Sequence, residues 1–330
     1  MDLKDKSLLI TGGSGSFGHA YAEHLLNNTD VGKIVIFSRD EYKQFRMKEK
    51  FAAHDHRMRY FIGDVRDAER LSRSLYGIDY VVHAAAMKQV PACEYNPIEA
   101  VKTNIHGAEN VINAAFENSS VETVIALSTD KAVNPINLYG GTKLVSDKLF
   151  AAANNHAGGR KTKFALVRYG NVAGSRGSVI PFFRAKINGG GQKLPLTDEE
   201  MTRFWMTLDK AVALVNKAFD LAQGGETFVY KNPSFYVADL IKAMNPDDGY
   251  DVIGVREGEK IHECMITHSD SMSTWEYDDY YVIYPIYSWW GEERLIPGGR
   301  KVEPGWAYTS DKNDWWLGLE ELITLLPEVK

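Results

Sequence analysis

The residues best suited to chemistry in this sequence lie close together in the stretch LSTDKAVNPINLYGGTK, from Leu127 to Lys143. The stretch contains a Thr-Asp-Lys triplet at 129–131 and a Tyr-x-x-x-Lys pair, Tyr139 and Lys143. That spacing places Tyr139 and Lys143 on one face of a helix, one turn apart. A nearby lysine lowers the pKa of a phenol, which suits the tyrosine to act as general base for a substrate hydroxyl. The pair suggests hydride transfer, and the triplet suggests a further step.

A glycine-rich turn, TGGSGSFG, follows an apolar run and opens an amphipathic one. Glycines there allow a tight turn and the close approach of a pyrophosphate to the helix N-terminus, where free N–H groups favour negative charge. Strand, glycines and helix together favour a dinucleotide site over a purely structural turn. The residues expected to line this site are Thr11, Gly12, Ser14, Gly15, Ser16, Phe17 and Gly18.

The end of the second expected strand indicates which dinucleotide is bound. An acidic residue there would hold an unphosphorylated ribose, but the sequence has Ser38 and Arg39, with Asp40 displaced by one position. Arg39 and the nearby Lys43 would attract a 2′-phosphate, so NADP is favoured over NAD. The alternative is that these two cations only cover a solvated helix start. Asp64, after the third strand, is expected either to meet the adenine edge or to cap a helix.

Strands that alternate with helical stretches must position these residues. Short runs rich in apolar and β-branched residues occur at 7–11, 33–38, 59–64, 80–86, 123–128 and 163–169. This alternation predicts an α/β fold with a doubly wound parallel sheet of the Rossmann type. We expect residues 1–172, with a return segment at about 202–230, to form the dinucleotide-binding domain. Residues 173–201 and 231–330 would form a smaller, C-terminal domain that binds the substrate.

Composition excludes several other classes of protein. The 330 residues are 44% hydrophobic and carry a formal charge of −6, which is typical of a soluble enzyme. Mixed charges argue against a nucleic-acid binder, which would need a clustered basic face. Cys93 and Cys264 form no CxxC motif, His83 is expected in the core, and no metal site is predicted. Neither an export signal nor a run of about 18 apolar residues is seen, so no membrane span and a cytoplasmic location are predicted.

From the glycine turn through Tyr139 and Lys143 to RYGNVAGSRGSVIP, the chain resembles the extended short-chain dehydrogenase/reductase superfamily. In simple epimerases of that superfamily, the strand before the catalytic helix ends in small hydroxyl residues, without the acid and base found here at Asp130 and Lys131. Dehydration of a sugar across C5 and C6 needs oxidation at C4, a base for the C5 proton and an acid for the departing C6 hydroxyl. Asp130 and Lys131 supply such groups; the alternative is a surface turn in which Asp130 caps a helix.

Lys131 can act as a base only if its pKa is depressed. Burial or positive neighbours would have this effect, and Lys143, Lys88 and an enclosed pocket are the candidates. The sequence therefore predicts a lowered pKa for Lys131.

Longer motifs make the resemblance more specific. AAMKQVPACEYNPIEAVKTNIHG, LSTDKAVNPINLYGGTK, RYGNVAGSRGSVIPFF, TRFW and REGEKIHECMI are together similar to the inverting UDP-N-acetylglucosamine 4,6-dehydratases, which begin pathways to pseudaminic acid and related surface sugars. Retaining nucleotide-sugar dehydratases typically have glutamate where Lys131 stands. Their membrane-attached relatives that carry the lysine tend to have methionine where Tyr139 stands. Lys131 and Tyr139 together therefore suggest the C5-inverting group.

The resemblance implies a catalytic role for each matching residue. Asp130 would be the acid, Lys131 the C5 base, and Tyr139, beside Lys143, the base at the C4 hydroxyl that also assists reprotonation. Thr129 would position the sugar. The resemblance adds cofactor contacts at Val65, Ala84, Ala85, Ala86 and Lys88.

The same resemblance implies contacts with the nucleotide sugar at Lys88, Asn171, Val179, Arg203, Arg256 and Glu259. Asn171 would meet the diphosphate. Arg256 would pair with the phosphates and Glu259 with the ribose hydroxyls, as suits a guanidinium and a carboxylate. The alternative for Arg256 and Glu259 is a structural ion pair in a loop.

The sequence thus predicts an enzyme that binds NADP and UDP-N-acetylglucosamine and gives UDP-2-acetamido-2,6-dideoxy-arabino-hex-4-ulose. The alternatives are a UDP-sugar 4-epimerase and a nucleotide-sugar-binding regulatory protein without turnover. Members of the family generally form closed oligomers, often hexamers, so a homo-oligomer is expected. Four tryptophans near the C-terminus are assigned to the core and to subunit contacts: Trp289, Trp290, Trp315 and Trp316.

Overall fold

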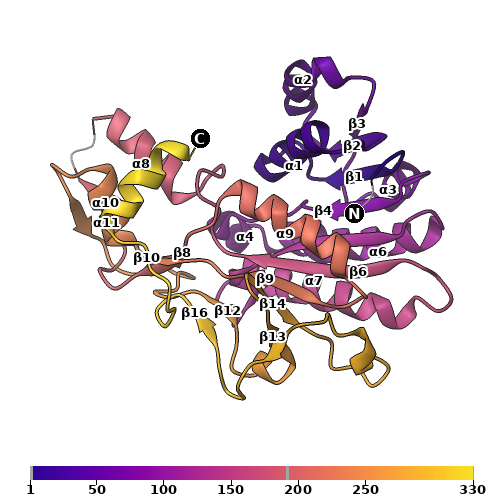
Figure 1. Cartoon of the computed structure of the whole chain (residues 1–330). Helices are drawn as coiled ribbons and strands as arrows, with labels where there is room; N and C mark the ends of the chain where they lie inside the picture. The colour runs from indigo at the N-terminus through magenta and orange to yellow at the C-terminus, as the bar shows by residue number, and fades with distance from the viewer. Residues whose placement is uncertain (1–2, 191–192, 330) are drawn as a thin grey trace.

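A computed structural model describes residues 3–190 and 193–329 (Figure 1). Within this part of the chain, ten strands form one large sheet in the order β15-β13-β14-β9-β6-β5-β4-β1-β2-β3. Seven of them run parallel: β1 (Ser7–Thr11), β2 (Lys33–Ser38), β3 (Met58–Ile62), β4 (Tyr80–His83), β5 (Thr123–Thr129), β6 (Lys163–Tyr169) and β9 (Thr227–Tyr230). The predicted parallel, doubly wound sheet is therefore confirmed.

Helices cover both faces of the sheet, because successive side chains of a buried strand point to opposite faces. Leu8 and Ile10 of β1 belong to one hydrophobic core, and Leu9 between them belongs to the other. The first core is closed by α1 (Ser16–Asn28), α2 (Glu41–Lys50) and α9 (Leu208–Leu221). The second is closed by α3 (Ala68–Ser74), α6 (Gly107–Glu117) and α7 (Leu138–Ala153). The short helices α4 (Val90–Tyr95) and α5 (Pro97–Val101) lie between β4 and α6 in the chain.

A third core lies to one side of the sheet, at the left of Figure 1. It is built by three helices, α8 (Val179–Asn188), α10 (Val237–Met244) and α11 (Leu319–Leu325). Short strands pair around it: β7 (Leu194–Leu196) with β11 (Tyr250–Val252), and β8 (Thr202–Phe204) with β10 (Ser234–Tyr236). A further pair, β12 (Cys264–Ile266) and β16 (Tyr308–Thr309), connects this region to the underside of the sheet.

Three strands from the last third of the chain extend the central sheet. Residues 231–330 were all expected in the smaller domain, but β14 (Tyr280–Ile283) pairs antiparallel with β9, followed by β13 (Thr274–Glu276) and β15 (Arg300–Lys301). The open edge of β9 offers unpaired backbone groups that a strand from any part of the chain can satisfy. Trp290 packs against the first core here, whereas Trp289 and Trp315 are exposed.

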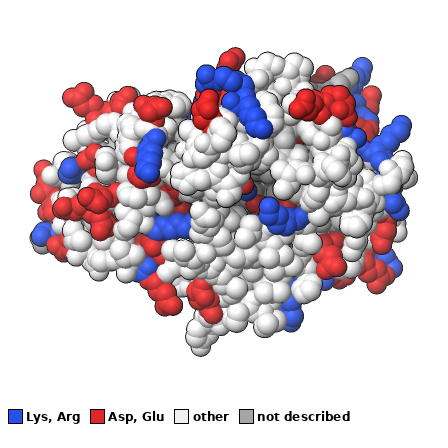
Figure 2. All heavy atoms as spheres, turned by 90° about the horizontal axis from the view of Figure 1, so that it is seen from below, with Lys and Arg blue, Asp and Glu red and all other residues white. Residues whose placement is uncertain are grey.

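Charged side chains of both signs are interspersed on the face seen in Figure 2, and no broad basic patch covers it. None of the helices described is long and apolar enough to cross a membrane.

Candidate active site

The Thr-Asp-Lys triplet lies where β5 leaves the sheet. Thr129 is the last residue of β5, and a short 3₁₀ turn follows at Asp130–Ala132. The Thr129 hydroxyl accepts a hydrogen bond from the N–H of Lys131 at 3.3 Å and donates one to Asp130 Oδ1 at 2.9 Å. Ligands of open α/β sheets bind at the carboxyl ends of the strands, so the triplet has the position of a reacting centre.

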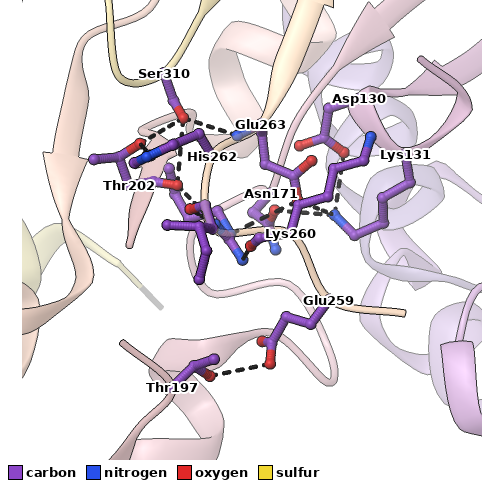
Figure 3. A network of polar contacts seen from close by, with 12 residues as sticks. Asp130, Lys131, Asn171, Thr197, Thr202, Glu259, Lys260, His262, Glu263 and Ser310 are labelled. Atoms are coloured by element: carbon purple, nitrogen blue, oxygen red, sulfur yellow. Dashed lines mark hydrogen bonds and ion pairs between the residues drawn. The ribbon is translucent and has the colours of Figure 1, made fainter. Parts of the chain in front are cut away.

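Asp130 and Lys131 contact each other inside the molecule (Figure 3). Lys131 Nζ donates to Asp130 Oδ1 at 3.1 Å and to Asn171 Oδ1 at 3.2 Å. Asp130 is only 1% exposed, and the residue that caps the turn is Thr129. The alternative of a surface turn capped by Asp130 is therefore wrong.

Two glycines make room for this pair. A Cβ at Gly170 would lie 2.9 Å from Asp130 Oδ2, and a Cβ at Gly140 would lie 2.1 Å from the carbonyl oxygen of Lys131. Both distances are shorter than side chains allow. Gly140 therefore lets α7 pack against the turn after β5, and Gly170, which follows β6, leaves room for the Asp130 carboxylate. Sequence analysis did not single out either glycine.

The charge environment of Lys131 differs from the prediction. Burial lowers the pKa of Lys131, but the carboxylates of Asp130 and Glu263 outweigh burial, and the net pKa is raised. Lys131 Nζ lies 3.5 Å from Glu263 Oε1. The predicted lowering is wrong for the ligand-free protein, because Glu263 adds a negative charge that sequence reasoning did not place here.

Tyr139 and Lys143 lie on consecutive turns of α7, as predicted. The helix begins after Asn137, whose side chain accepts from the N–H of Gly140 at 2.8 Å. Both residues are buried, and Lys143 Nζ donates to the Leu127 carbonyl at 2.8 Å. Burial raises the pKa of Tyr139 to about 12, against the opposing effect of Lys131. The predicted lowering of the phenol's pKa is therefore wrong, because the effect of burial exceeds that of the nearby positive charge.

His83, at the end of β4, is a core residue as predicted. Its Nδ1 lies 2.8 Å from the Thr11 hydroxyl, and burial, aided by the charge of Lys143, lowers its pKa to about 3. The Thr11 hydroxyl also accepts from the N–H groups of Ala84 and Ala85 at 3.2 and 3.3 Å. A neutral histidine thus joins the ends of β1 and β4 beside the glycine turn.

The glycine turn has the close backbone approach that a dinucleotide site requires. Gly12 has a φ of +64°, and a Cβ there would lie 2.8 Å from the Cα of Ala85. A Cβ at Gly18 would lie 2.1 Å from the carbonyl oxygen of Gly13. Gly15 is the N-cap of α1 and offers no side chain to its first N–H groups, which suits a bound pyrophosphate.

The remaining residues of the turn lie around this cradle. Ser14 is buried, and Phe17 packs against the first core. The Ser16 hydroxyl accepts from the N–H of Arg176 at 3.2 Å, which brings the loop after β6 over the turn.

The residues after β2 and β3 come together, as their expected shared role requires. Arg39 Nη1 lies 3.7 Å from Asp64 Oδ2, and its side chain is 60% exposed. Lys43 Nζ pairs with Asp40 Oδ2 at 2.6 Å, and Asp40 caps α2. Ser38 is buried and its hydroxyl accepts from Gln44 at 2.9 Å.

Asp64 pairs with Arg66 and does not cap α3, whose N-cap is Asp67. The capping alternative for Asp64 is therefore wrong. Val65, the next residue, is buried, and its carbonyl oxygen accepts from Asn110 at 2.9 Å.

Other residues expected to hold the nucleotide sugar are in part engaged by the protein. Arg203 is buried and its guanidinium donates to the carbonyls of Thr202, Ile261 and Lys260 at 2.7, 2.9 and 2.9 Å. It therefore shapes the loop at 260–261 in the ligand-free protein. Val179 is the first residue of α8 and packs against the third core.

Arg256 and Glu259 form a two-pronged ion pair, with N to O distances of 3.0 and 3.1 Å. Glu259 also accepts from the Thr197 hydroxyl at 3.0 Å. The contact fits the ion-pair alternative, and Figure 3 shows Glu259 below Lys131. Lys88 is electrostatically close to Lys131 and Arg176: burial and these two charges lower its pKa.

Glu263 is the main residue of the site that sequence reasoning missed. It belongs to the motif REGEKIHECMI, but nothing in the local pattern distinguishes it from its neighbours. In the part of the chain described, no group of three or more His, Cys, Asp or Glu side chains is arranged to hold a metal ion.

The chain is similar to several known proteins. Residues 8–285 match the family model described as polysaccharide biosynthesis protein. The chain is 52% identical over 327 residues to the UDP-N-acetylglucosamine 4,6-dehydratase (inverting) of Campylobacter jejuni, covering 97% of both chains. It is 41% identical over 337 residues to the UDP-glucose 4-epimerase of Rickettsia canadensis, covering 98% of this chain and 95% of the relative. Pen from Bacillus thuringiensis has a similar structure, with a TM-score of 0.90 at 39% identity over 99% of this chain and all of its own.

Proposed function

Since this chain belongs to the polysaccharide biosynthesis protein family, we propose that it is an NADP-dependent, configuration-inverting UDP-N-acetylglucosamine 4,6-dehydratase. The observation that carries the proposal is the contact between the buried Asp130 and the partly buried Lys131, at the end of β5 and beside Tyr139. An acid and a base in contact are needed for elimination of water and have no use in a simple epimerisation. The 52% identity to a protein named for this activity supports the proposal.

The residues of the chain would divide the proton transfers among them. Tyr139 takes the proton of the C4 hydroxyl, Lys131 takes the C5 proton, and Asp130 gives its proton to the C6 hydroxyl as it leaves as water. The glycine turn and Arg39 would hold NADP, which would supply the hydride chemistry for oxidation at C4 and reduction at C6 with no net change in the cofactor. A proton returned to C5 from the opposite face, assisted by Tyr139, inverts that carbon.

Lys131 and Asp130 form an ion pair, and one proton must move between them before they can act as base and acid. An ammonium cannot accept the C5 proton, and a carboxylate cannot protonate a leaving hydroxyl. Transfer of one proton from Lys131 to Asp130, along their 3.1 Å hydrogen bond, converts both groups to the working form. The total number of protons on the pair does not change, so the raised pKa of Lys131 is compatible with its role as a base.

The experiment that tests the function is proton NMR of UDP-N-acetylglucosamine incubated with the protein in deuterated water. We expect a new C6 methyl signal, deuterium at C5 and the coupling constants of the arabino sugar. Inversion at C4 without a methyl signal would instead support the epimerase alternative, which the name of the Rickettsia relative keeps relevant. Tight UDP-sugar binding without turnover, across several UDP-sugars, would favour the regulatory protein.

The preference for NADP rests on the surroundings of Arg39. We expect Arg39→Ala to weaken NADP binding roughly 10- to 100-fold while NAD binding changes little, since one charge-assisted hydrogen bond to the 2′-phosphate is lost. Calorimetric titration with each dinucleotide measures both affinities. Arg46→Ala is the matched control, because Arg46 is an exposed arginine of α2, the helix that follows Arg39, and pairs with Glu49. Equal losses for NADP and NAD would contradict the assignment.

Oligomer formation and a cytoplasmic location remain predictions. The proposed ligand is a UDP-sugar, and the proposed contacts to it are those of Lys88, Asn171, Val179, Arg203, Arg256 and Glu259. The Arg256 and Glu259 side chains would exchange their mutual ion pair for the phosphates and the ribose when the nucleotide binds.

A further inference from the structure

Glu263 is held in place by its own backbone rather than by its carboxylate. Its N–H donates to the Ser310 hydroxyl at 2.9 Å, and the Ser310 N–H donates to its carbonyl at 2.9 Å. The same hydroxyl lies 2.7 Å from that of Thr202, whose other neighbour is His262 at 2.9 Å. Figure 3 shows Glu263 between these contacts on one side and the Asp130 turn on the other. The side chain is thus carried into the site by a rigid frame.

The carboxylate itself is buried and incompletely satisfied. Glu263 is 3% exposed; its Oε1 lies 3.5 Å from Lys131 Nζ and 3.8 Å from Arg203 Nε. Its Oε2 has no hydrogen-bond partner among the residues described. A carboxylate that served only as a structural anchor would be expected to have both oxygens paired, because an unpaired buried oxygen is costly. The arrangement indicates that Glu263 acts on Lys131.

The contacts of Lys131 account for every donor of its ammonium group. An ammonium has three N–H donors, and three acceptors face it: Asp130 Oδ1, Asn171 Oδ1 and Glu263 Oε1 at 3.1, 3.2 and 3.5 Å. Transfer of one proton to Asp130 leaves an amine that still has two N–H groups. Asn171 and Glu263 then hold the Nζ atom in place beside Asp130.

We propose that Glu263 is a positioning residue that holds Lys131 Nζ beside Asp130, where the amine can take the C5 proton of the sugar. This inference rests on the proposed dehydratase function and assigns a residue to the same site. Glu263 has no proton transfer of its own in this scheme. Its charge also holds the single shared proton of Asp130 and Lys131 more tightly, since a nearby negative charge favours the protonated form of both groups.

The pH dependence of kcat separates this role from a merely structural one. The charged or titratable groups that face Lys131 are Asp130, Glu263, Tyr139, Arg203 and Lys88. The pair works with one shared proton, so kcat falls when the pair gains a second proton at low pH or loses its only one at high pH. Glu263→Gln keeps the shape and one acceptor but removes the negative charge, which weakens proton binding to the pair. Both limbs of the profile should therefore move to lower pH, the alkaline limb by about one unit or more.

The experiment measures kcat, KM and the pH profile of methyl-product formation for the wild type and Glu263→Gln. We expect kcat to fall about tenfold and KM to stay within about twofold, because Glu263 orients the base and is not assigned to the sugar. Glu276→Gln is the matched control: Glu276 also pairs with one lysine and one arginine, Lys231 at 2.9 Å and Arg300 at 2.6 Å, and lies on β13. Its profile should equal that of the wild type.

The proposal would be overturned if both limbs of the pH profile of folded Glu263→Gln lay at the wild-type pH, or if its KM were raised while its kcat was normal. If that variant does not fold, Glu263→Asp keeps the charge and withdraws it by one methylene. Glu263→Asp should lower kcat about tenfold and leave the limbs of the pH profile nearly unchanged. A wild-type kcat in Glu263→Asp would also overturn the proposal. Absence of any methyl product from the wild-type protein would be a failure of the proposed function, and is thus distinguished from a failure at Glu263.

Discussion

Replacement of Lys131 by methionine should reduce dehydration by about 1000-fold or more, because it removes the group that takes the C5 proton. Loss of a general base costs about 10²- to 10⁴-fold, and no other described side chain contacts Asp130 as an amine base. Methionine keeps most of the apolar volume, so the contact with the rest of the site is preserved. In deuterated water the variant should give neither a methyl signal nor deuterium at C5.

The same variant distinguishes the two enzymatic hypotheses. Oxidation at C4 depends on Tyr139, so absorbance of the reduced dinucleotide should still develop when substrate is added to the Lys131→Met protein. A 4-epimerase would keep its activity without Lys131. Lys148→Met serves as the control, since Lys148 is an exposed lysine on α7 and should leave turnover unchanged. Undiminished methyl formation by Lys131→Met would refute the assignment of the C5 base.

Replacement of Tyr139 by phenylalanine should reduce the rate of every step by about 10²- to 10⁴-fold, because the C4 hydroxyl then keeps its proton. The C5 proton becomes acidic only after C4 is oxidised, so exchange at C5 should disappear as well. Absorbance of the reduced dinucleotide should be lost too, which is the opposite of the result expected for Lys131→Met. Stopped-flow absorbance and NMR on the same samples measure these effects.

The control for the tyrosine variant is Tyr60→Phe. The Tyr60 hydroxyl, on β3, is buried without a hydrogen-bond partner among the residues described, so its removal should disturb little. Tyr139→Phe should unfold near the wild-type temperature, since the ring remains in its pocket. Retention of C5 exchange in a folded Tyr139→Phe protein would mean that another group takes the C4 proton.

Much of the fold could be predicted from local patterns in the sequence. The strands at 7–11, 33–38 and 163–169 and the helix at 138–153 lie at the positions that their periodicity predicts. These elements are specified by neighbouring residues: continuous apolar runs for strands that are buried on both faces, and a spacing of three and four for helices. The assignment of residues to domains was harder to predict from the sequence. β14 pairs with β9 although their residues are about 50 positions apart, and this pairing depends on which sheet edge remains open.

The candidate site likewise has parts that local sequence predicts and parts that only long-range packing decides. The triplet at Asp130, the Tyr139 and Lys143 pair and the glycine turn were predictable, since each is a short motif whose geometry follows from one strand or one helix turn. The presence of Glu263 beside Lys131, and hence the raised pKa of that lysine, was not predictable, because the two residues are brought together only when β12 packs beneath the turn after β5. Electrostatics depends on distance in space, and a sequence records distance along the chain. Residue types thus specify which chemistry is available, and long-range packing sets the charge and orientation with which each group acts.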